Sequence, residues 1–300
     1  MNKITLWGFS IAVSMNIAFS NEVTKQLDLR MQETHSLVCV GLDPDITKMP
    51  LSLIDSERSN EENIFVFLSQ IVDITSQHVC CYKIQKAFFD QYETGHSLLN
   101  RVIAYVHDEH PGIPVFVDCK IGDIDNTMSA YMHRLFDEAK ADGVVVNPYM
   151  GGDVLAPFLQ DPKKVAIVLV QTSNPSAMIV QGLMLQNRHE LWEEILDLTL
   201  TQWNQNENMI VVLSSQSTSD YRLIREKIPQ NTPILLAGIG SQGGNPAIMK
   251  QLLNTEKRGV FVNSSRGILY PYEPSNENWQ AEVLKATLEL KETLNKIRED

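Results

Sequence analysis

The stretch FVDCKIGDIDNT at positions 116–127 places three charged side chains, Asp118, Lys120 and Asp123, within six residues. It follows an apolar run that is typical of a buried strand. Because side chains alternate across a strand, we expect Asp118 and Lys120 on one face and Cys119 on the other. Neighbouring opposite charges keep each other ionised even in a poorly hydrated site. The pattern predicts a functional charged array, with a structural ion-pair network as the alternative.

A second candidate is the glycine-rich run GIGSQGG at 238–244. Glycines such as Gly240 and Gly243 let backbone N–H groups turn toward an anion, and Arg266, one strand later, can fork onto phosphate oxygens. The run therefore predicts a phosphate site, with a plain turn as the alternative. It also matches G-x-G-x-x-G, but the next strand ends in Asn263-Ser-Ser-Arg. A dinucleotide site would need an acidic residue there, so we disfavour it.

These residues need a scaffold that brings strand ends together. Eight short β-branched runs lie at 37–43, 80–85, 114–120, 143–148, 165–172, 209–215, 233–240 and 259–266. Most are too continuously apolar for a strand with one wet face, so they suit a parallel sheet covered on both sides. Helical patterns lie at 62–77, 97–109, 128–140, 189–204, 219–227, 246–255 and 278–297. The alternation predicts an α/β fold, a TIM (β/α)₈ barrel in a single domain, with a doubly wound sheet as the alternative.

In such a barrel the catalytic groups gather at the C-terminal ends of the strands. The ends of the first, second and fifth predicted strands add Asp43, Lys83 and Ser173 to the candidates. Lys83 ends the strand that neighbours the strand of Asp118, so its ammonium can join the same charged array.

Composition narrows the function. The chain has 300 residues and a net charge of −12, which argues against nucleic-acid binding. Its four cysteines lie in apolar runs without CxxC spacing, as expected for reduced thiols of a cytoplasmic protein. The densest metal-ligand cluster, at 107–110, precedes Pro111-Gly112, so we interpret it as a solvated helix end and predict no metal site.

The N-terminal stretch MNKITLWGFSIAVSMNIAFSNE imitates a signal peptide, with an apolar run and a small-residue site ending at Ser20. Polar residues interrupt that run, and it is too short to span a bilayer. A start at Met15 is the other interpretation. An exported protein that binds a phosphate ligand is thus one alternative function. No other segment is apolar enough to cross a membrane.

Beyond these patterns, the run from Asp118 to Thr127, D-x-K-x-x-D-I-x-x-T, resembles the signature of the orotidine 5′-phosphate decarboxylase family. The likeness extends in order through VGLDPD, YKIQKAFFDQYE, VNPYMGGD, TSNPSA, LLAGIGSQGG and NSSRGILY, and is similar to the longer bacterial (type 2) branch. It implies a TIM barrel that converts orotidine 5′-phosphate to UMP and CO₂, the final step of de novo UMP biosynthesis, without metal or organic cofactor.

The resemblance also implies a role for each site residue. Lys120 would be the proton donor, held between Asp118 and Asp123. Lys83 would complete this catalytic set and, with Asp43, hold the ribose. Ser173 would contact the pyrimidine, and Gln242 and Arg266 with the glycine-rich loop would bind the phosphate. Losing CO₂ leaves an electron pair that the pyrimidine ring cannot delocalise, so a fixed ammonium must stabilise it before protonating the carbon.

In this family the second aspartate and the threonine of the motif act in the neighbouring subunit. The resemblance therefore implies a homodimer in which Asp123 and Thr127 cross the interface. Family members of this branch begin with a short helix before the VGLDP strand, so we expect residues 1–14 to be dispensable, residues 15–300 to form the decarboxylase domain, and the protein to be cytoplasmic.

The sequence departs from the family pattern at Ile121 and at Ser265, where a glycine often precedes the phosphate-binding arginine. The nearest rival function is a magnesium-dependent sugar-phosphate decarboxylase or synthase on the same barrel. That class needs an added carboxylate, and none follows Lys83 at the end of its strand.

Overall fold

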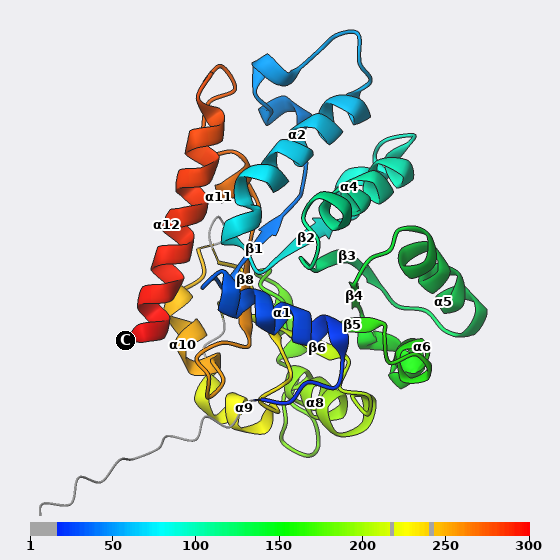
Figure 1. Ribbon diagram of the computed structural model, residues 1–300. Coiled ribbons are helices and arrows are strands. Elements are labelled where there is room, and N and C mark those ends of the chain that lie inside the picture. The colour runs from blue at the N-terminus through cyan, green and yellow to red at the C-terminus, as the bar shows by residue number, and fades with distance from the viewer. Residues whose placement is uncertain (1–16, 217–218, 240–242) are drawn as a thin grey trace, which may run out of the picture.

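The computed structural model describes residues 17–216, 219–239 and 243–300. Eight parallel strands pair in chain order and close into a barrel (Figure 1). They are β1 (Val38–Gly41), β2 (Cys81–Gln85), β3 (Val115–Ile121), β4 (Gly143–Val146), β5 (Val165–Leu169), β6 (Met209–Ser214), β7 (Ile234–Ala237) and β8 (Val260–Ser264). All eight predicted strands are confirmed. The doubly wound alternative is wrong, because β1 pairs with β8 and leaves no open edge.

Helices surround the barrel wherever the periodicity predicted them. They are α2 (Asn60–Thr75), α4 (Gly95–Glu109), α5 (Asp125–Met132), α8 (Leu191–Leu198), α9 (Tyr221–Lys227), α10 (Met249–Leu252) and α12 (Trp279–Glu299). Short π-helical segments at 133–138 and 199–203 extend α5 and α8 to nearly their predicted lengths. Shorter helices that we did not predict are α3 (Ala87–Asp90), α6 (Ala156–Gln160), α7 (Ala177–Gln181) and α11 (Arg266–Leu269).

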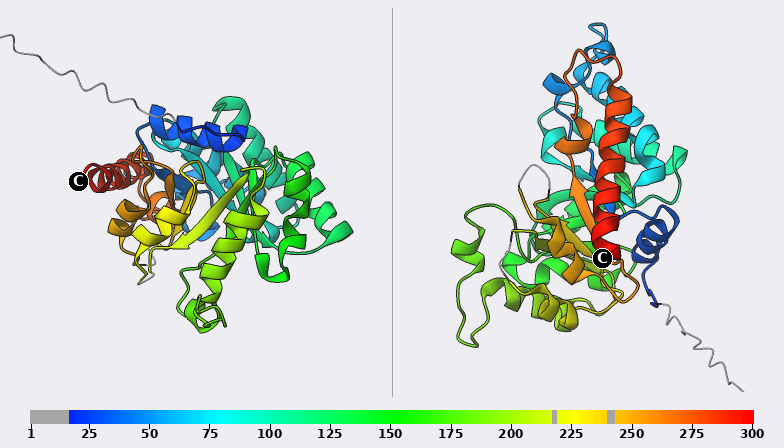
Figure 2. Two further views of the ribbon diagram at one scale, coloured as in Figure 1. Left: turned by 90° about the horizontal axis from the view of Figure 1, so that it is seen from below. Right: turned by 90° about the vertical axis from the view of Figure 1, so that its left-hand side faces the viewer.

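Helix α2 shows how the sequence sets these elements. Ser59 caps its start by accepting a hydrogen bond from the backbone N–H of Glu62 at 3.1 Å. Its apolar residues recur at helical spacing, and Phe67 is fully buried. The Phe67 ring stacks on Tyr270 and tilts against Trp279, the first residue of α12. The long α12 thereby packs along one side of the barrel (Figure 2).

Helix α1 (Glu22–Glu33) precedes β1, as the resemblance implied. Its side chains reach the segments that lead into several strands. Gln26 donates to the carbonyl of Gly112 before β3, Arg30 donates to the carbonyl of Val79 before β2, and Asp28 pairs with Arg258 before β8. The helix therefore closes the N-terminal end of the barrel (Figure 1).

Within the described ranges, no helix is both long and apolar enough to cross a membrane. The proposed dispensable segment, residues 1–14, lies outside those ranges, as does the signal-like stretch up to residue 16.

Candidate active site

A cavity of about 1040 Å³ opens at the carboxyl ends of the strands, opposite α1. Six predicted site residues line it: Asp43, Lys83, Asp118, Lys120, Ser173 and Arg266. Their convergence follows from the barrel, which brings the ends of β1, β2, β3, β5 and β8 to one mouth.

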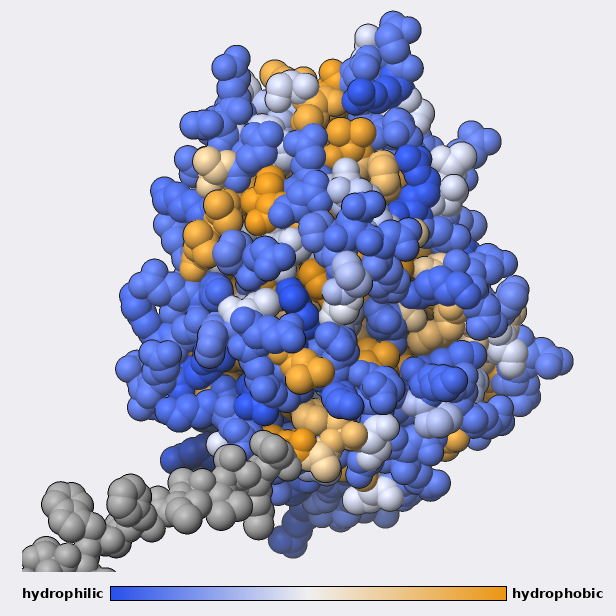
Figure 3. Space-filling view, in the orientation of Figure 1, coloured by the Kyte–Doolittle hydropathy of each residue, from blue (hydrophilic) through white to orange (hydrophobic). Residues whose placement is uncertain are grey.

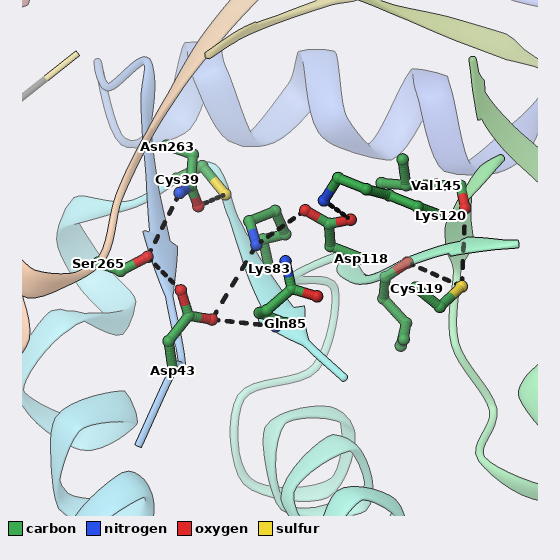
Figure 4. A network of polar contacts seen from close by, with 11 residues as sticks. Cys39, Asp43, Lys83, Gln85, Asp118, Cys119, Lys120, Val145, Asn263 and Ser265 are labelled. Carbon is green, nitrogen blue, oxygen red and sulfur yellow. Dashed lines mark hydrogen bonds and ion pairs between the residues drawn. The ribbon is translucent and has the colours of Figure 1, made fainter. Parts of the chain in front are cut away.

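Asp118 is the centre of the charged array (Figure 4). Its Oδ1 accepts a hydrogen bond from Lys120 Nζ at 2.7 Å, and its Oδ2 accepts one from Lys83 Nζ at 3.4 Å. Lys83 Nζ also lies 4.0 Å from Asp43 Oδ1. Two ammonium groups and two carboxylates therefore alternate across the mouth, as predicted from residue types and strand ends.

The two lysines differ in environment. The Lys83 side chain is 7% exposed, whereas that of Lys120 is 45% exposed and reaches into the cavity. Burial alone would lower the pKa of Lys83, but the negative charges of Asp43 and Asp118 outweigh it and raise that pKa above its ordinary value. Lys83 is thus a fixed positive charge, while Lys120 can meet a bound molecule.

The backbone of β3 is irregular where it presents Lys120. The register with β4 shifts between Val117 and Ile121, and Lys120 has a φ of +46°, a left-handed conformation that side chains disfavour. The prediction that Asp118 and Lys120 share a face is confirmed, but regular strand alternation is not the reason. The bulge turns the Lys120 amine back onto Asp118, and Cys119 points away toward the Val145 carbonyl.

Two groups hold Asp43 that sequence reasoning did not identify. The backbone N–H of Gln85 donates to Asp43 Oδ1 at 3.0 Å, and the hydroxyl of Ser265 donates to Oδ2 at 2.6 Å. A backbone donor leaves no signal in residue types. Ser265 was noticed in the sequence as a departure from the expected pattern. Its partner could not be identified there, because Asp43 is 222 residues away.

On the opposite wall, Thr172 and Ser173 follow β5. The Gln181 side chain accepts from the backbone N–H of Thr172 at 3.0 Å and donates to its hydroxyl at 2.8 Å. These two bonds fix the start of the loop that carries Ser173 into the cavity. Sequence reasoning missed Gln181 because α7 is too short to show a periodic pattern.

The structure describes part of the glycine-rich run 238–244 that was predicted to bind phosphate. Gly238 lines the cavity with a φ of +93°, and a side chain there would collide with Ser173. As expected from the sequence, a helical turn starts at Pro246, capped by Asn245. Gly243 is exposed and is not among the described residues that line the cavity. Gly240 and Gln242 lie outside the described residues.

Asp123 and Thr127 do not join the cavity of their own chain. Asp123 accepts a hydrogen bond from the backbone N–H of Ile124 at 2.8 Å, and Thr127 is exposed on α5. Neither is among the described residues that line the cavity.

A closed (β/α)₈ barrel with alternating ammonium and carboxylate groups at its mouth defines a barrel enzyme with a site for a small charged molecule. Comparison with known proteins gives the family. Residues 36–279 match the family described as "Orotidine 5'-phosphate decarboxylase / HUMPS family", so the chain belongs to this family.

Curated relatives agree over nearly the whole chain. The orotidine 5′-phosphate decarboxylase of Cupriavidus metallidurans is 37% identical over 92% of this chain and 98% of its own length. That of Dechloromonas aromatica is 37% identical over 91% and 98%. Among solved structures, the OMP decarboxylase of Leishmania donovani is 28% identical, with a TM-score of 0.76 over 93% of this chain and 99% of its own.

Proposed function

We propose that this protein decarboxylates orotidine 5′-phosphate to UMP and CO₂, the final step of de novo UMP biosynthesis. The observation that carries this function is Asp118 shared between two lysines at the barrel mouth, with one lysine buried and the other reaching into the cavity. A family match and curated relatives of the same activity support it.

The proposed chemistry uses the charged array directly. When CO₂ leaves, the ring carbon keeps the bonding electron pair, which stays in the ring plane. The Lys120 ammonium stabilises that charge and then transfers its proton to the carbon. Asp118, whose Oδ1 lies 2.7 Å from Lys120 Nζ, holds the amine in place. Lys120 is thus the catalytic acid, and Asp118 orients it.

The remaining cavity residues bind the rest of the substrate. In this proposal Asp43 and Lys83 hold the ribose and Ser173 contacts the pyrimidine. Arg266, Gln242, Gly240 and Gly243 bind the phosphate far from the reacting carbon. Binding energy from the phosphate can then be used to orient the ring, which lowers the barrier at a remote centre.

The direct test is to add orotidine 5′-phosphate to the purified protein and follow the absorbance change as the substrate is consumed. Turnover that persists in EDTA supports a metal-free reaction. Loss of activity in EDTA with recovery by Mg²⁺ would favour the magnesium-dependent rival, and no turnover at all would refute the proposed function.

We further propose that the enzyme is a homodimer in which Asp123 and Thr127 complete the partner's site. The loops after β3 and β4 adjoin, since the N–H of Asn147 donates to the Ile121 carbonyl at 2.7 Å. Large apolar side chains are exposed on them and on the following helix: Ile124, Tyr131, Tyr149 and Met150. An apolar surface beside the mouth would bring Asp123 near a second cavity.

Mixing two inactive variants tests this arrangement. Lys120→Ala lacks the acid, and Asp123→Asn lacks the shared carboxylate. If Asp123 acts across the interface, random mixed dimers contain one intact site, and an equal mixture regains roughly a quarter of wild-type activity. If Asp123 acts within its own chain, mixing restores nothing.

The proposed location is the cytoplasm. Cys39, Cys80, Cys81 and Cys119 are all free thiols, in keeping with a reducing compartment. Finding the protein in the medium, cleaved after Ser20, would contradict this proposal.

A further inference from the structure

We propose that the Ser265 hydroxyl is a positioning group for Asp43, which ties the ribose-binding carboxylate to the strand end that carries Arg266. This inference rests on the proposed function, in which Asp43 holds the ribose. It concerns the residue that immediately precedes Arg266 in the chain.

The hydrogen bonds around Asp43 give the serine a definite role. Ser265 Oγ donates to Asp43 Oδ2 at 2.6 Å, while the backbone N–H of Gln85 donates to Oδ1 at 3.0 Å. Asn263 Nδ2 lies 3.4 Å from Ser265 Oγ and donates to it. The hydroxyl proton is thereby directed at the carboxylate, since the amide supplies the other contact. One donor on each oxygen fixes the plane of the carboxylate (Figure 4).

Asp43 needs this support because of its place in the chain. It lies two residues beyond β1, which ends at Gly41, so strand pairing does not fix its side chain. The carboxylate is mostly buried, at 13% exposed, which makes each missing donor costly.

The absence of a side chain at Gly41 leaves room for the Ser265 side chain. A Cβ on Gly41 would lie 1.9 Å from Ser265 Oγ and 2.9 Å from its Cβ. The serine side chain therefore occupies the volume that any other residue at 41 would fill. Gly41 and Ser265 act as a matched pair, and a side chain at 41 would push the hydroxyl off Asp43.

The serine also joins two parts of the ligand site. It immediately precedes Arg266, the first residue of α11 and part of the cavity wall. A hydroxyl that bonds to Asp43 fixes the distance between the phosphate-binding end and the ribose-binding carboxylate. Loss of this bond should weaken recognition of a nucleotide while leaving recognition of a bare phosphate unchanged.

The test compares competitive inhibition by UMP and by inorganic phosphate in wild type and Ser265→Ala. We expect the inhibition constant for UMP, and the KM for orotidine 5′-phosphate, to rise about tenfold, as for loss of one hydrogen bond to a charged group. The constant for phosphate and kcat should change less than about twofold. An equal rise for phosphate would make Ser265 a phosphate ligand and overturn the proposal.

A double-mutant cycle shows whether the serine acts through Asp43. In an Asp43→Ala background, Ser265→Ala should change UMP inhibition less than about twofold. A full tenfold effect there would overturn the proposal. Ser264→Ala is the matched control, because it removes the hydroxyl of the neighbouring residue, the last of β8, and it should leave UMP inhibition unchanged.

Gly41→Ala gives an independent line of evidence. It should raise the UMP constant like Ser265→Ala, and adding Ser265→Gly should relieve the collision without restoring affinity. Unchanged UMP inhibition in folded Gly41→Ala would contradict the inference. If wild type fails to turn over orotidine 5′-phosphate, the proposed function fails instead, so the two failures are distinguishable.

Discussion

The two ends of the barrel use charge differently. At the closed end, Arg258 Nε lies 2.5 Å from Asp28 Oδ1, and Gln32 donates to the other oxygen of Asp28 at 2.7 Å. At the open end, Asp118 divides its oxygens between two lysines, and one of those lysines is 45% exposed. The charges at the closed end are paired with other side chains of the protein, whereas the Lys120 ammonium at the open end is also accessible to a ligand.

This difference separates stability from activity. A buried ion pair links the helices and strands that carry its two members, and removing one member leaves the other buried without a partner. An exposed cation beside a shared carboxylate adds little to folding but can stabilise a charge that develops in a ligand. The face that carries α1 is mainly hydrophilic, with apolar residues scattered across it (Figure 3). We expect substitutions at the two ends to affect different measurements.

The largest effect should come from Lys120→Ala at the open end. It removes both the charge and the proton donor, so turnover of orotidine 5′-phosphate should fall by at least about 10⁴-fold. The melting temperature should hardly change, because the side chain is exposed. Lys296→Ala, which breaks an exposed pair with Glu292 on α12, is the matched control and should keep full activity. A Lys120→Ala rate within tenfold of wild type would refute the catalytic role.

At the closed end, Arg258→Met should destabilise the fold without altering the chemistry. It leaves Asp28 buried without its cation, and the free energy of unfolding should drop by about 3 kcal/mol, measured by urea denaturation. The kcat of the folded fraction should stay at the wild-type value. Adding Asp28→Leu should recover most of the stability, and a failure to recover would mean that the ion pair is not the cause.

A smaller, pH-dependent effect is expected at the closed end from His107 in the last turn of α4. Its Nε2 lies 3.0 Å from Asp142 Oδ2, which also accepts from the N–H of Val115 at 2.7 Å. The hydrogen bond that His107 donates to the Asp142 carboxylate raises the pKa of His107, and burial opposes this only partly. The protonated histidine therefore stabilises the folded state below its unfolded pKa of about 6.5, and this contribution is lost as pH rises through the folded pKa.

His107→Gln tests that sign. The variant should be less stable than wild type by on the order of 1 kcal/mol near pH 6. The gap should shrink toward about pH 9, where wild-type His107 is neutral. A gap that stays constant with pH would show that shape or packing, rather than charge, accounts for the difference.

The smallest effect should come from removing residues 1–14. A protein that begins at Met15 should match the full chain in activity and differ by less than about 0.5 kcal/mol in unfolding free energy. A protein that begins after Glu33 lacks α1 and should fail to fold, because the contacts that close the barrel are gone. Inactivity of the Met15 form would contradict the predicted domain boundary.

The sequence predicts the barrel well because strand and helix periods are local properties. Continuous apolar runs identify buried parallel strands, and the strand ends place Asp43, Lys83 and Asp118 at one mouth. The bond from Ser265 to Asp43 could not be predicted, since it joins residues 222 apart whose spacing depends on barrel closure. The bulge at Lys120 was also hidden, because Cys119 and Ile121 beside it are ordinary strand residues.

The left-handed backbone conformation at Lys120 sets thermal stability against activity at this strand end. A glycine at this position would relieve a conformational strain of roughly 1 kcal/mol, so the most stable version of this strand end is one without the lysine. Selection of variants for heat resistance alone would therefore favour the loss of this side chain. Any thermostabilised version of the protein needs a parallel selection for turnover.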